Sequence, residues 1–429
     1  MTNAGGKTVG KTSDGVRSDA WPTRRAMLAV IWAVVCALAV LAPSARAGSE
    51  DKFVGLWVTR WDYRTAADVR DVMDRAAAAG FTDVVWQVRG QADAYYQSAI
   101  EPWGDEILKG APDGAATPGF DPLAVAVELA HASGLRLHAW VNVMPMWKGK
   151  APPTNQKHLI YTHPEWRLVN QRGEVQPLND HYVIVNPVLP EVHDYLVGVF
   201  KDIVTRYDVD GLHMDYVRFV SELMGKDDVY PADEKSQLLF KQATGREGIS
   251  TPEDKAALKA YVKQRITDLV VRIRKEAVGS REGVVFSAAI WRRPDLARDT
   301  YLQDSPAWLN DKVLDLGMPM IYTDKDEQFT SDLKAWLAAT PEARLAPGLG
   351  VYLIKPAMTP SQIGITRELV GTPPSIAIFA YSSLFESADP NQNKSFDAAE
   401  ERKTRLFFVK DALSAMSGGT SEASEHKPE

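Results

Sequence analysis

Cysteine is almost absent from this chain, since the only one among its 429 residues is Cys36. Cys36 lies in an apolar N-terminal run that we expect to be removed, so the mature protein would contain none. A chain without cysteine forms no disulfide, thiolate zinc site or cysteine nucleophile. An excess of basic residues is also absent, because the net charge is −7. A nucleic acid partner is therefore not expected.

Several catalytic motifs are missing as well. No glycine-rich nucleotide fingerprint follows the first strand-like run, and neither His-Glu-x-x-His nor Gly-x-Ser-x-Gly occurs. Hydrophobic residues make up 45% and charged residues 24% of the chain, which excludes a disordered, collagenous or coiled-coil protein. The composition is that of a globular protein, and its chemistry must be found in residues outside these motifs.

The N-terminus has the pattern of an export signal. Arg24 and Arg25 precede fifteen uncharged, mostly apolar residues, Met27–Leu41, and Ala45–Ala47 supplies a small-x-small cleavage site. A membrane span needs roughly 20 apolar residues, so we predict a signal peptide over residues 1–47 rather than an uncleaved anchor. The paired arginines also fit a twin-arginine export motif. We expect an extracytoplasmic protein, in the periplasm, on the surface or secreted, without stable membrane insertion after cleavage.

One large domain is predicted to fill the rest of the chain. We expect a linker at residues 48–52, the domain at 53–416 and a flexible polar tail at 417–429. Residues 1–47 carry six basic and two acidic side chains, a net charge of +4, so their removal changes the net charge of the chain from −7 to −11. The mature protein is therefore distinctly acidic.

Apolar strand-like runs alternate with helical stretches along the predicted domain. The eight expected strands are Phe53–Trp61, Asp83–Arg89, Arg136–Met144, Gly211–Phe219, Val284–Trp291, Leu314–Tyr322, Leu345–Tyr352 and Ile376–Ser382. The expected helices include Ala66–Ala79, Pro122–Ser133, Pro190–Tyr207 and Ala256–Val278. This alternation predicts parallel strands with helical crossovers, and eight of them predict an α/β fold, the (β/α)8 TIM barrel. An open doubly wound sheet is the competing fold.

A period of two separates each expected strand into a helix-facing set and a lumen-facing set. In the fourth strand, Leu212 and Met214 share one face while His213 and Asp215 share the other. The polar set should rise to the carboxyl ends of the strands, where barrels of this kind hold their active sites. Two long connections, 146–190 and 220–252, follow strand ends, so we expect them to wall a cleft there.

Asp215 is the leading catalytic candidate. It lies where the fourth strand should reach the rim, and burying a carboxylate there is costly without a task. Arg218 is near enough in sequence to hold it ionised. An ionised carboxylate suits a nucleophile or charge stabiliser at an oxocarbenium-like centre, although a structural Asp–Arg pair fits the spacing equally. Asp210 begins the same strand next to a glycine, so we expect a structural role for it.

Glycoside hydrolysis normally needs a second carboxyl group that protonates the leaving oxygen. Asp93, Asp324 and Glu386 follow the second, sixth and eighth strands, and the sequence does not choose among them. Aromatic residues add a further signal, because sugar rings stack on flat amphipathic side chains. Trp61, Trp140 and Trp291 lie at strand ends, whereas Trp103 and Trp147 lie in the loops that follow. These five residues suggest a platform for sugars.

A metal site is the main alternative to an active site made only of protein side chains. His138, His213 and Asp215 all fall in lumen-facing sets, so a site of two histidines and one carboxylate is conceivable. Hydrogen bonding within the barrel accounts for the two histidines more simply. We therefore expect neither a metal nor an organic cofactor.

The order of these residues resembles the glycosyl hydrolase-like 10 family of bacterial envelope proteins over roughly residues 52–390. The blocks that carry the resemblance are Gly55–Val58, Gln87–Arg89, Asp93–Tyr96, Glu101–Trp103, Gly119–Leu123, His138–Asn142, Asn186–Pro187, Pro190–Val192, Val209–Gly211, Asp215, Pro319, Ile321–Tyr322 and Gly348–Gly350. The resemblance implies a TIM barrel that cleaves bacterial cell-wall glycan, with peptidoglycan strands as the substrate class. It also implies that Asp215 is catalytic and that Gln87, Arg89, Asp93, Trp140 and Asn142 line the cleft.

Two positions depart from the family pattern. A second Asp usually follows the fourth-strand Asp, but Tyr216 stands here, and Asn186 replaces the Asp of an Asp-Pro pair. We predict an exported glycoside hydrolase with Asp215 and Asp93 as its catalytic pair. The expected substrate-binding residues are Gln87, Arg89, His138, Trp140, Asn142, His213, Arg218, Trp291 and Tyr322. A non-catalytic glycan-binding protein and a metal-dependent hydrolase using His138, His213 and Asp215 are the alternatives.

Overall fold

The computed structural model describes residues 52–220, 228–371, 375–396 and 399–416. The described residues form one compact unit. The predicted signal peptide, residues 1–47, and the predicted tail, residues 417–429, lie outside the described residues, as does the linker except for Lys52. No helix among the described residues is long and apolar enough to cross a membrane.

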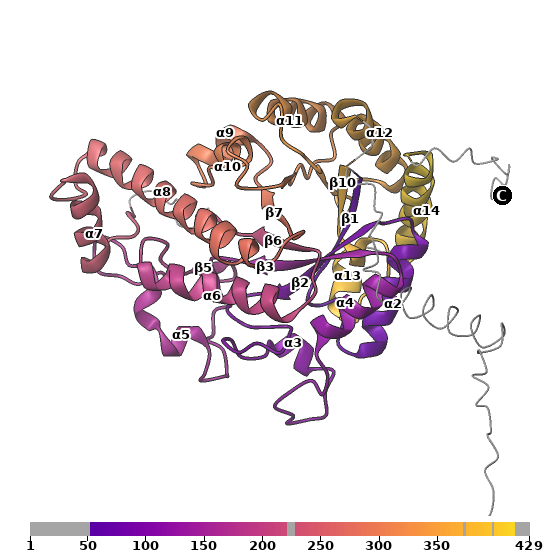
Figure 1. Ribbon diagram of the computed structural model, residues 1–429, viewed down its shortest axis with the longest axis horizontal. Coiled ribbons are helices and arrows are strands. Elements are labelled where there is room, and N and C mark those ends of the chain that lie inside the picture. The colour runs from indigo at the N-terminus through magenta and orange to yellow at the C-terminus, as the bar shows by residue number, and fades with distance from the viewer. Residues whose placement is uncertain (1–51, 221–227, 372–374, 397–398, 417–429) are drawn as a thin grey trace, which may run out of the picture. The chain divides into compact units, whose positions relative to one another are not determined.

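Eight parallel strands form one sheet in the order β8-β7-β6-β3-β2-β1-β10-β9 (Figure 1). The strands are β1 (Phe53–Val58), β2 (Asp83–Arg89), β3 (Arg136–Asn142), β6 (Gly211–Asp215), β7 (Val285–Ile290), β8 (Leu316–Pro319), β9 (Gly348–Gly350) and β10 (Ser375–Phe379). Isolated parallel bridges join Gly317 to Leu345 and Met320 to Gly348, so the two outermost strands meet and nearly close the barrel. The TIM barrel is confirmed, and the open doubly wound sheet is wrong.

Helices surround the strands (Figure 1). They are α2 (Ala66–Ala78), α3 (Asp105–Leu108), α4 (Pro122–Ala132), α5 (Leu159–Thr162), α6 (Pro190–Arg206), α7 (Glu234–Thr244), α8 (Pro252–Glu276), α9 (Pro294–Asp299), α10 (Ser305–Asn310), α11 (Asp326–Ala339), α12 (Thr359–Val370), α13 (Pro390–Phe396) and α14 (Ala399–Met416). Capping explains several starts: Thr65 closes a capping box on α2, and Asp121 accepts from the first amides of α4. Short 3-10 turns lie at Pro164–Trp166, Val278–Ser280, Pro356–Met358 and Tyr381–Ser383.

Two hydrophobic cores follow from the period of two in the strands. The larger core lies between strands and helices and includes Leu212 and Met214 of β6. The smaller core fills the barrel interior with Phe53, Trp57 and Trp140 among others. The two predicted faces of the strands are confirmed, and the inward set is the one that continues to the carboxyl rim.

Strand lengths and one hairpin differ from the predictions. The fourth strand was expected to reach Phe219, but β6 ends at Asp215 because Tyr216 adopts φ 50°, in the left-handed region that breaks a strand. The long connection 146–190 contains an antiparallel pair, β4 (Pro145–Lys148) and β5 (Tyr182–Ile184). Neither strand is long enough to show a hydrophobic period, so the sequence did not predict them.

Candidate active site

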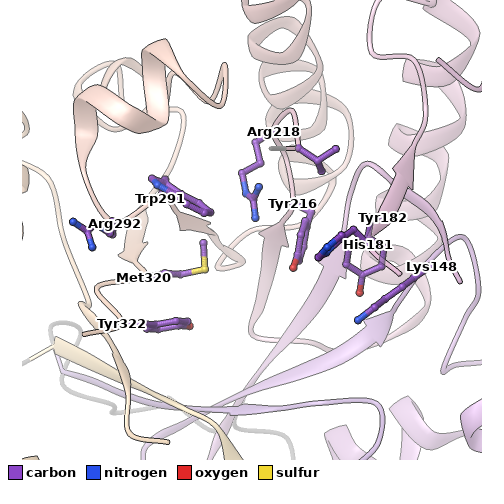
Figure 2. A pocket seen from close by; sticks show the side chains of 10 residues that line it. Lys148, His181, Tyr182, Tyr216, Arg218, Trp291, Arg292, Met320 and Tyr322 are labelled. Carbon is purple, nitrogen blue, oxygen red and sulfur yellow. The ribbon is translucent and has the colours of Figure 1, made fainter. Parts of the chain in front are cut away.

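Two adjoining cavities open at the carboxyl ends of the strands. The inner cavity has a volume of about 290 Å³ and the outer cavity about 410 Å³. Six residues line both, so we treat them together as the cleft: Lys148, Tyr182, Tyr216, Arg218, Met320 and Tyr322. Figure 2 shows the outer cavity, with Trp291 and Arg292 on one side and Lys148 on the other. The remaining inner residues are Trp57, Thr59, Arg60, Trp61, Gln87, Trp140, Asn142, Asp215, Ala289, Tyr352 and Phe379.

Asp215 is the only carboxylate among the described residues that line the cleft. It ends β6 opposite Asn142 of β3, and its side chain accepts a 2.7 Å hydrogen bond at Oδ1 from the backbone N–H of Tyr216. Parallel strands end together at this rim, which is why the last inward residue of β6 reaches the cavity. The sequence prediction that Asp215 lies at the rim of the fourth strand is thus matched by the fold.

The electrostatics of Asp215 reverse our expectation. Burial raises its pKa to about 6, although Arg218, the Tyr216 amide and Trp140 each act to lower it. Arg218 therefore does not hold the carboxylate ionised, because its charge is outweighed by the loss of water around Asp215. A carboxyl group with this pKa keeps its proton in mildly acidic solution, and that property suits a proton donor better than a nucleophile.

Tyr216 adopts an unusual backbone conformation beside the acid. Its φ of 50° costs about 1–2 kcal/mol for a residue that carries a Cβ. The turn directs the amide onto Asp215 and brings the ring within 4.8 Å of the Tyr182 ring, centroid to centroid, in an edge-on contact. A strained backbone conformation of this kind persists where neighbouring contacts hold it in place. Here the strain bends the chain out of β6 and places an aromatic wall next to the acid.

Hydrogen bonds hold three predicted residues in place at the inner cavity. Trp140 Nε1 donates to Asn142 Oδ1 at 2.9 Å, and Asn142 Nδ2 donates to the Gly90 carbonyl at 3.0 Å. Gln87 Oε1 accepts from the Arg60 amide at 3.0 Å. All three line the inner cavity with Asp215, so the structure brings these predicted residues together.

The outer wall holds the other predicted aromatic residues. Tyr322 stacks on Phe379 with ring centroids 5.4 Å apart, and Trp291 lies 3.8 Å from the Tyr301 ring. Gly350 permits the position of Tyr322, because a Cβ at residue 350 would come within 2.9 Å of the Tyr322 side chain. Arg218 lies over the rings of Trp291 and Tyr301 and lines both cavities. Trp291, Tyr322 and Arg218 therefore lie at the cleft, as placed by the sequence.

Arg89 and Asp93 do not line the cleft. Arg89 is fully buried, pairs with Glu101 at 2.8 Å and donates to the Val143 carbonyl at 3.1 Å. Asp93 Oδ1 accepts from the backbone amides of Gly90 and Gln91, at 3.2 and 2.8 Å. Both side chains are occupied in holding the loop that follows β2. Both side chains were expected from the sequence to face the substrate, and this prediction is wrong because both hold a loop in place.

The other candidate acids are also absent from the cleft lining. Asp324 and Glu386 are solvent-exposed, on segments that follow β8 and β10. Of the four acids considered, the structure brings only Asp215 into either cavity.

His138 and His213 do not converge with Asp215 on a metal. His138 pairs with Gly211, four residues before Asp215, about 13 Å away along the strands. Its Nε2 bonds Asp83 at 2.9 Å. Among the described residues, no group of three or more His, Cys, Asp or Glu side chains could hold an ion. The proposed triad is therefore wrong.

His213 has both ring nitrogens engaged. Trp57 Nε1 donates to Nε2 at 3.3 Å, so the proton lies on Nδ1 and is directed at Ser287 Oγ, 2.9 Å away. Burial lowers the His213 pKa to about 3, so the ring is neutral at physiological pH. His138 and His213 thus lie below the cleft within the barrel and line neither cavity.

Several cleft residues were not predicted from the sequence. Arg60, Lys148, Tyr182 and Tyr352 come from loops or from the β4–β5 hairpin, where no periodic pattern marks an inward residue. Trp57 did carry a signal, because it shares the inward face of β1 with Phe53. The predicted platform is partly correct: Trp61, Trp140 and Trp291 line the cleft, whereas Trp103 and Trp147 do not.

A closed parallel barrel with an acid in an aromatic cleft at its carboxyl edge is the architecture of TIM-barrel glycoside hydrolases. Comparison with known proteins identifies the family within this class. The sequence model of the glycosyl hydrolase-like 10 family matches residues 52–348, and the chain belongs to this family. Membership agrees with the resemblance drawn from the sequence blocks.

Curated relatives agree with this assignment, and a solved structure shares the fold. Glycosyl hydrolase YngK of Bacillus subtilis (strain 168) is 24% identical over 307 residues, 65% of this chain and 55% of YngK. Glycosyl hydrolase DigH of Escherichia coli (strain K12) is 25% identical over 324 residues, 71% of this chain and 66% of DigH. The chain thus matches about half to two thirds of these relatives. The PgaB (BpsB) glycoside hydrolase domain from Bordetella bronchiseptica has the same fold, with a TM-score of 0.58 at 13% identity, covering 81% of this chain and 98% of that domain.

Proposed function

We propose that this protein is an exported glycosidase that cleaves glycosidic bonds in a bacterial envelope polysaccharide, the glycan strands of peptidoglycan, with Asp215 as the central catalytic group. The observation that carries the proposal is a buried carboxyl group with its pKa raised to about 6 in an aromatic cleft. Membership of a glycosyl hydrolase-like family supports the reaction class. The export-signal pattern and the resemblance to envelope proteins support the location and the substrate.

The chemistry follows from the position of Asp215. The protonated carboxyl group donates its proton to the glycosidic oxygen while the bond from that oxygen to the anomeric carbon breaks. The oxygen of a water molecule bonds to the anomeric carbon, and a proton from this water restores the carboxylic acid. Trp61, which is half-buried, offers a flat face to the C–H surfaces of sugar rings. Water is largely excluded around Asp215, which strengthens each electrostatic contact with the reacting atoms.

The test uses purified residues 48–429 and peptidoglycan glycan strands, with and without stem peptides. New reducing ends, detected by mass spectrometry, are expected from the wild type and not from Asp215→Asn. The masses of the ends identify the bond that is cleaved. Equal fragmentation by both proteins would remove Asp215 from the mechanism.

Glycan binding without turnover is the second candidate function. Two observations favour it: Asp215 is the only carboxylate among the described lining residues, and Tyr216 occupies the family's usual second Asp position. The same experiment separates the two functions. Retained binding of strands by the wild type, without any fragments, would establish the binding function.

A further inference from the structure

The charges that line the cleft are strongly unbalanced. Four cationic side chains, from Arg60, Lys148, Arg218 and Arg292, line it, against the single carboxylate of Asp215 among the described residues. Arg292 is matched by Asp332, 3.4 Å away. The other three cations form no salt bridge with any described residue. A site built for an uncharged sugar gains nothing from this excess of positive charge.

Among these cations, Arg218 gives the strongest evidence for an anionic ligand. It is only 7% exposed, and its guanidinium carbon lies 4.6, 4.7 and 5.3 Å from the ring centroids of Tyr216, Trp291 and Tyr301. Aromatic faces stabilise the charge but offer no lone pair in the plane of the guanidinium. Its Nη1 makes a long 3.5 Å contact to the Phe219 carbonyl, and its buried Nε has no partner. Among the described residues, Arg218 thus has no acceptor for Nε and only this long contact at Nη1.

Lys148 and Arg60 extend the positive region. Figure 2 shows Lys148 and Arg218 both directed into the outer cavity, past Tyr182 and Tyr216. Burial, and then repulsion by Arg60, lower the pKa of Lys148. Arg60 is 3% exposed and lies 3.9 Å above the Trp61 ring. The acids that these three cations face are few: Asp215 for Arg218, Asp93 for Arg60 and Asp180 for Lys148. Asp180 is already paired with Lys150 at 2.7 Å.

Holding the unpaired, buried cations Arg60 and Arg218 out of water costs free energy that an anionic ligand would return, and the exposed Lys148 adds positive charge to the same cleft. We propose that the cleft takes an acidic glycan, and that Arg218 and Lys148 bind a carboxylate carried by the sugar next to the bond that is cleaved. The guanidinium of Arg218 presents paired donors that match the two oxygens of a carboxylate. This inference rests on the proposed function, because it names the substrate class of the same cleft.

The first test needs only the wild-type protein. Stem-free glycan strands are compared with the same strands after amidation of their carboxyl groups by methylamine, which removes the charge and leaves the sugar backbone intact. A charged hydrogen bond predicts a KM about 10- to 100-fold lower for the acidic strands, with a smaller effect on kcat. The preference should weaken as salt is raised. Equal KM values for the two strands would overturn the proposal.

Variants then assign the preference to residues. Arg218→Met and Lys148→Met keep an unbranched apolar stem and remove the charge, and each should reduce the ratio of the two KM values toward one. Lys334→Met, on the exposed face of α11, removes one positive charge far from the cleft and should leave the ratio unchanged. A ratio retained in both cleft variants would overturn the assignment. Thermal melting of each variant checks that it is folded.

The outcomes also separate this inference from the proposed function. Cleavage of both strand types without preference contradicts only the acidic-glycan inference. Cleavage of neither type contradicts the hydrolase, and the binding of the two strand types to the wild type, measured by calorimetry, then decides on the carboxylate. Tighter binding of the acidic strands supports the inference, and equal binding overturns it.

Discussion

Two inward-facing acids of the barrel, Asp83 at the amino end and Asp215 at the carboxyl end, have opposite electrostatic environments. At the amino end, Asp83 pairs with Arg136 at 2.7 Å and His138 at 2.9 Å, and Asp210 accepts from the Leu137 amide at 2.8 Å. At the carboxyl end, Asp215 has no ion pair with a described residue.

The pKa values record the same contrast. Burial opposes ionisation of Asp83, but the bonds from His138 and Arg136 prevail and lower its pKa to about 2. Burial of Asp215 prevails instead and raises its pKa to about 6. Paired acids at one end hold strands together, whereas the unpaired acid at the other end is available for chemistry. Asp210 and Asp215 flank the same strand, so position rather than residue type separates the two roles.

The largest expected effect is the loss of hydrolysis in Asp215→Asn. Without the proton donor we expect kcat/KM to fall by about 10²–10⁴-fold, measured by release of reducing ends. Because the amide cannot ionise, the free energy of unfolding at pH 7.5 should rise by up to about 3 kcal/mol, from the two-unit pKa shift. Asp210→Asn is the matched control on the same strand. It should lower stability and leave the kcat/KM of the folded fraction unchanged.

A large loss of stability is expected from Asp83→Asn. Removing one charge of a buried ion pair costs about 3–5 kcal/mol, because Arg136 and His138 would lose the carboxylate charge and one of its two acceptor oxygens. Urea denaturation at pH 7 measures the change, with kcat/KM as the second readout. Unchanged stability would show that the amino end does not depend on its ion pairs. A fall in kcat/KM of the folded variant would show that Asp83 also affects catalysis, and would contradict the separate roles of the two ends.

The pH dependence should have opposite signs at the two ends. Protonated Asp215 is the active acid, so kcat/KM should fall about tenfold per pH unit above pH 6. Its contribution to stability is present below the unfolded pKa of about 3.9 and is lost as pH rises toward 6. Asp83 stabilises the fold above pH 3.9, and that contribution is lost as pH falls toward 2. A pH–rate profile and urea titrations across this range test both limbs. If kcat/KM began to fall only far above pH 6, the catalytic acid would be a group other than Asp215.

The smallest expected effect is from Trp61→Ala. Trp61 is half-buried at the inner cavity, so its loss should raise KM by about 3- to 10-fold through lost stacking on a sugar ring, with little change in stability. Trp147→Ala is a matched control, because Trp147 is also half-buried near the rim but does not line the cleft. Equal effects of the two substitutions would argue against a sugar platform at Trp61.

Most of the correct predictions came from periodic patterns in the sequence. Alternation of Leu212 and Met214 with His213 and Asp215 was enough to assign the faces of β6, because a strand reverses its side chains at every residue. Counting eight such runs was enough for the barrel. The acid at the rim and three of the aromatic residues followed from the same register.

Contacts between distant segments could not be predicted in this way. Asp93 was misassigned because its bonds to Gly90 and Gln91 depend on the fold of a loop. The β4–β5 hairpin, with Lys148 and Tyr182, lies in a connection that has no period. Arg218 was expected to hold Asp215 ionised, but only the folded structure shows that the burial of Asp215 outweighs the charge of Arg218.

The sequence by itself determined the strand faces, the barrel and the position of Asp215, since these depend on local alternation and on the order of elements along the chain. The tertiary structure alone decided the state of the charges. Desolvation of Asp215 and the isolation of Arg218 arise from atoms brought together by closure of the barrel, and no local pattern encodes how much water such a group loses.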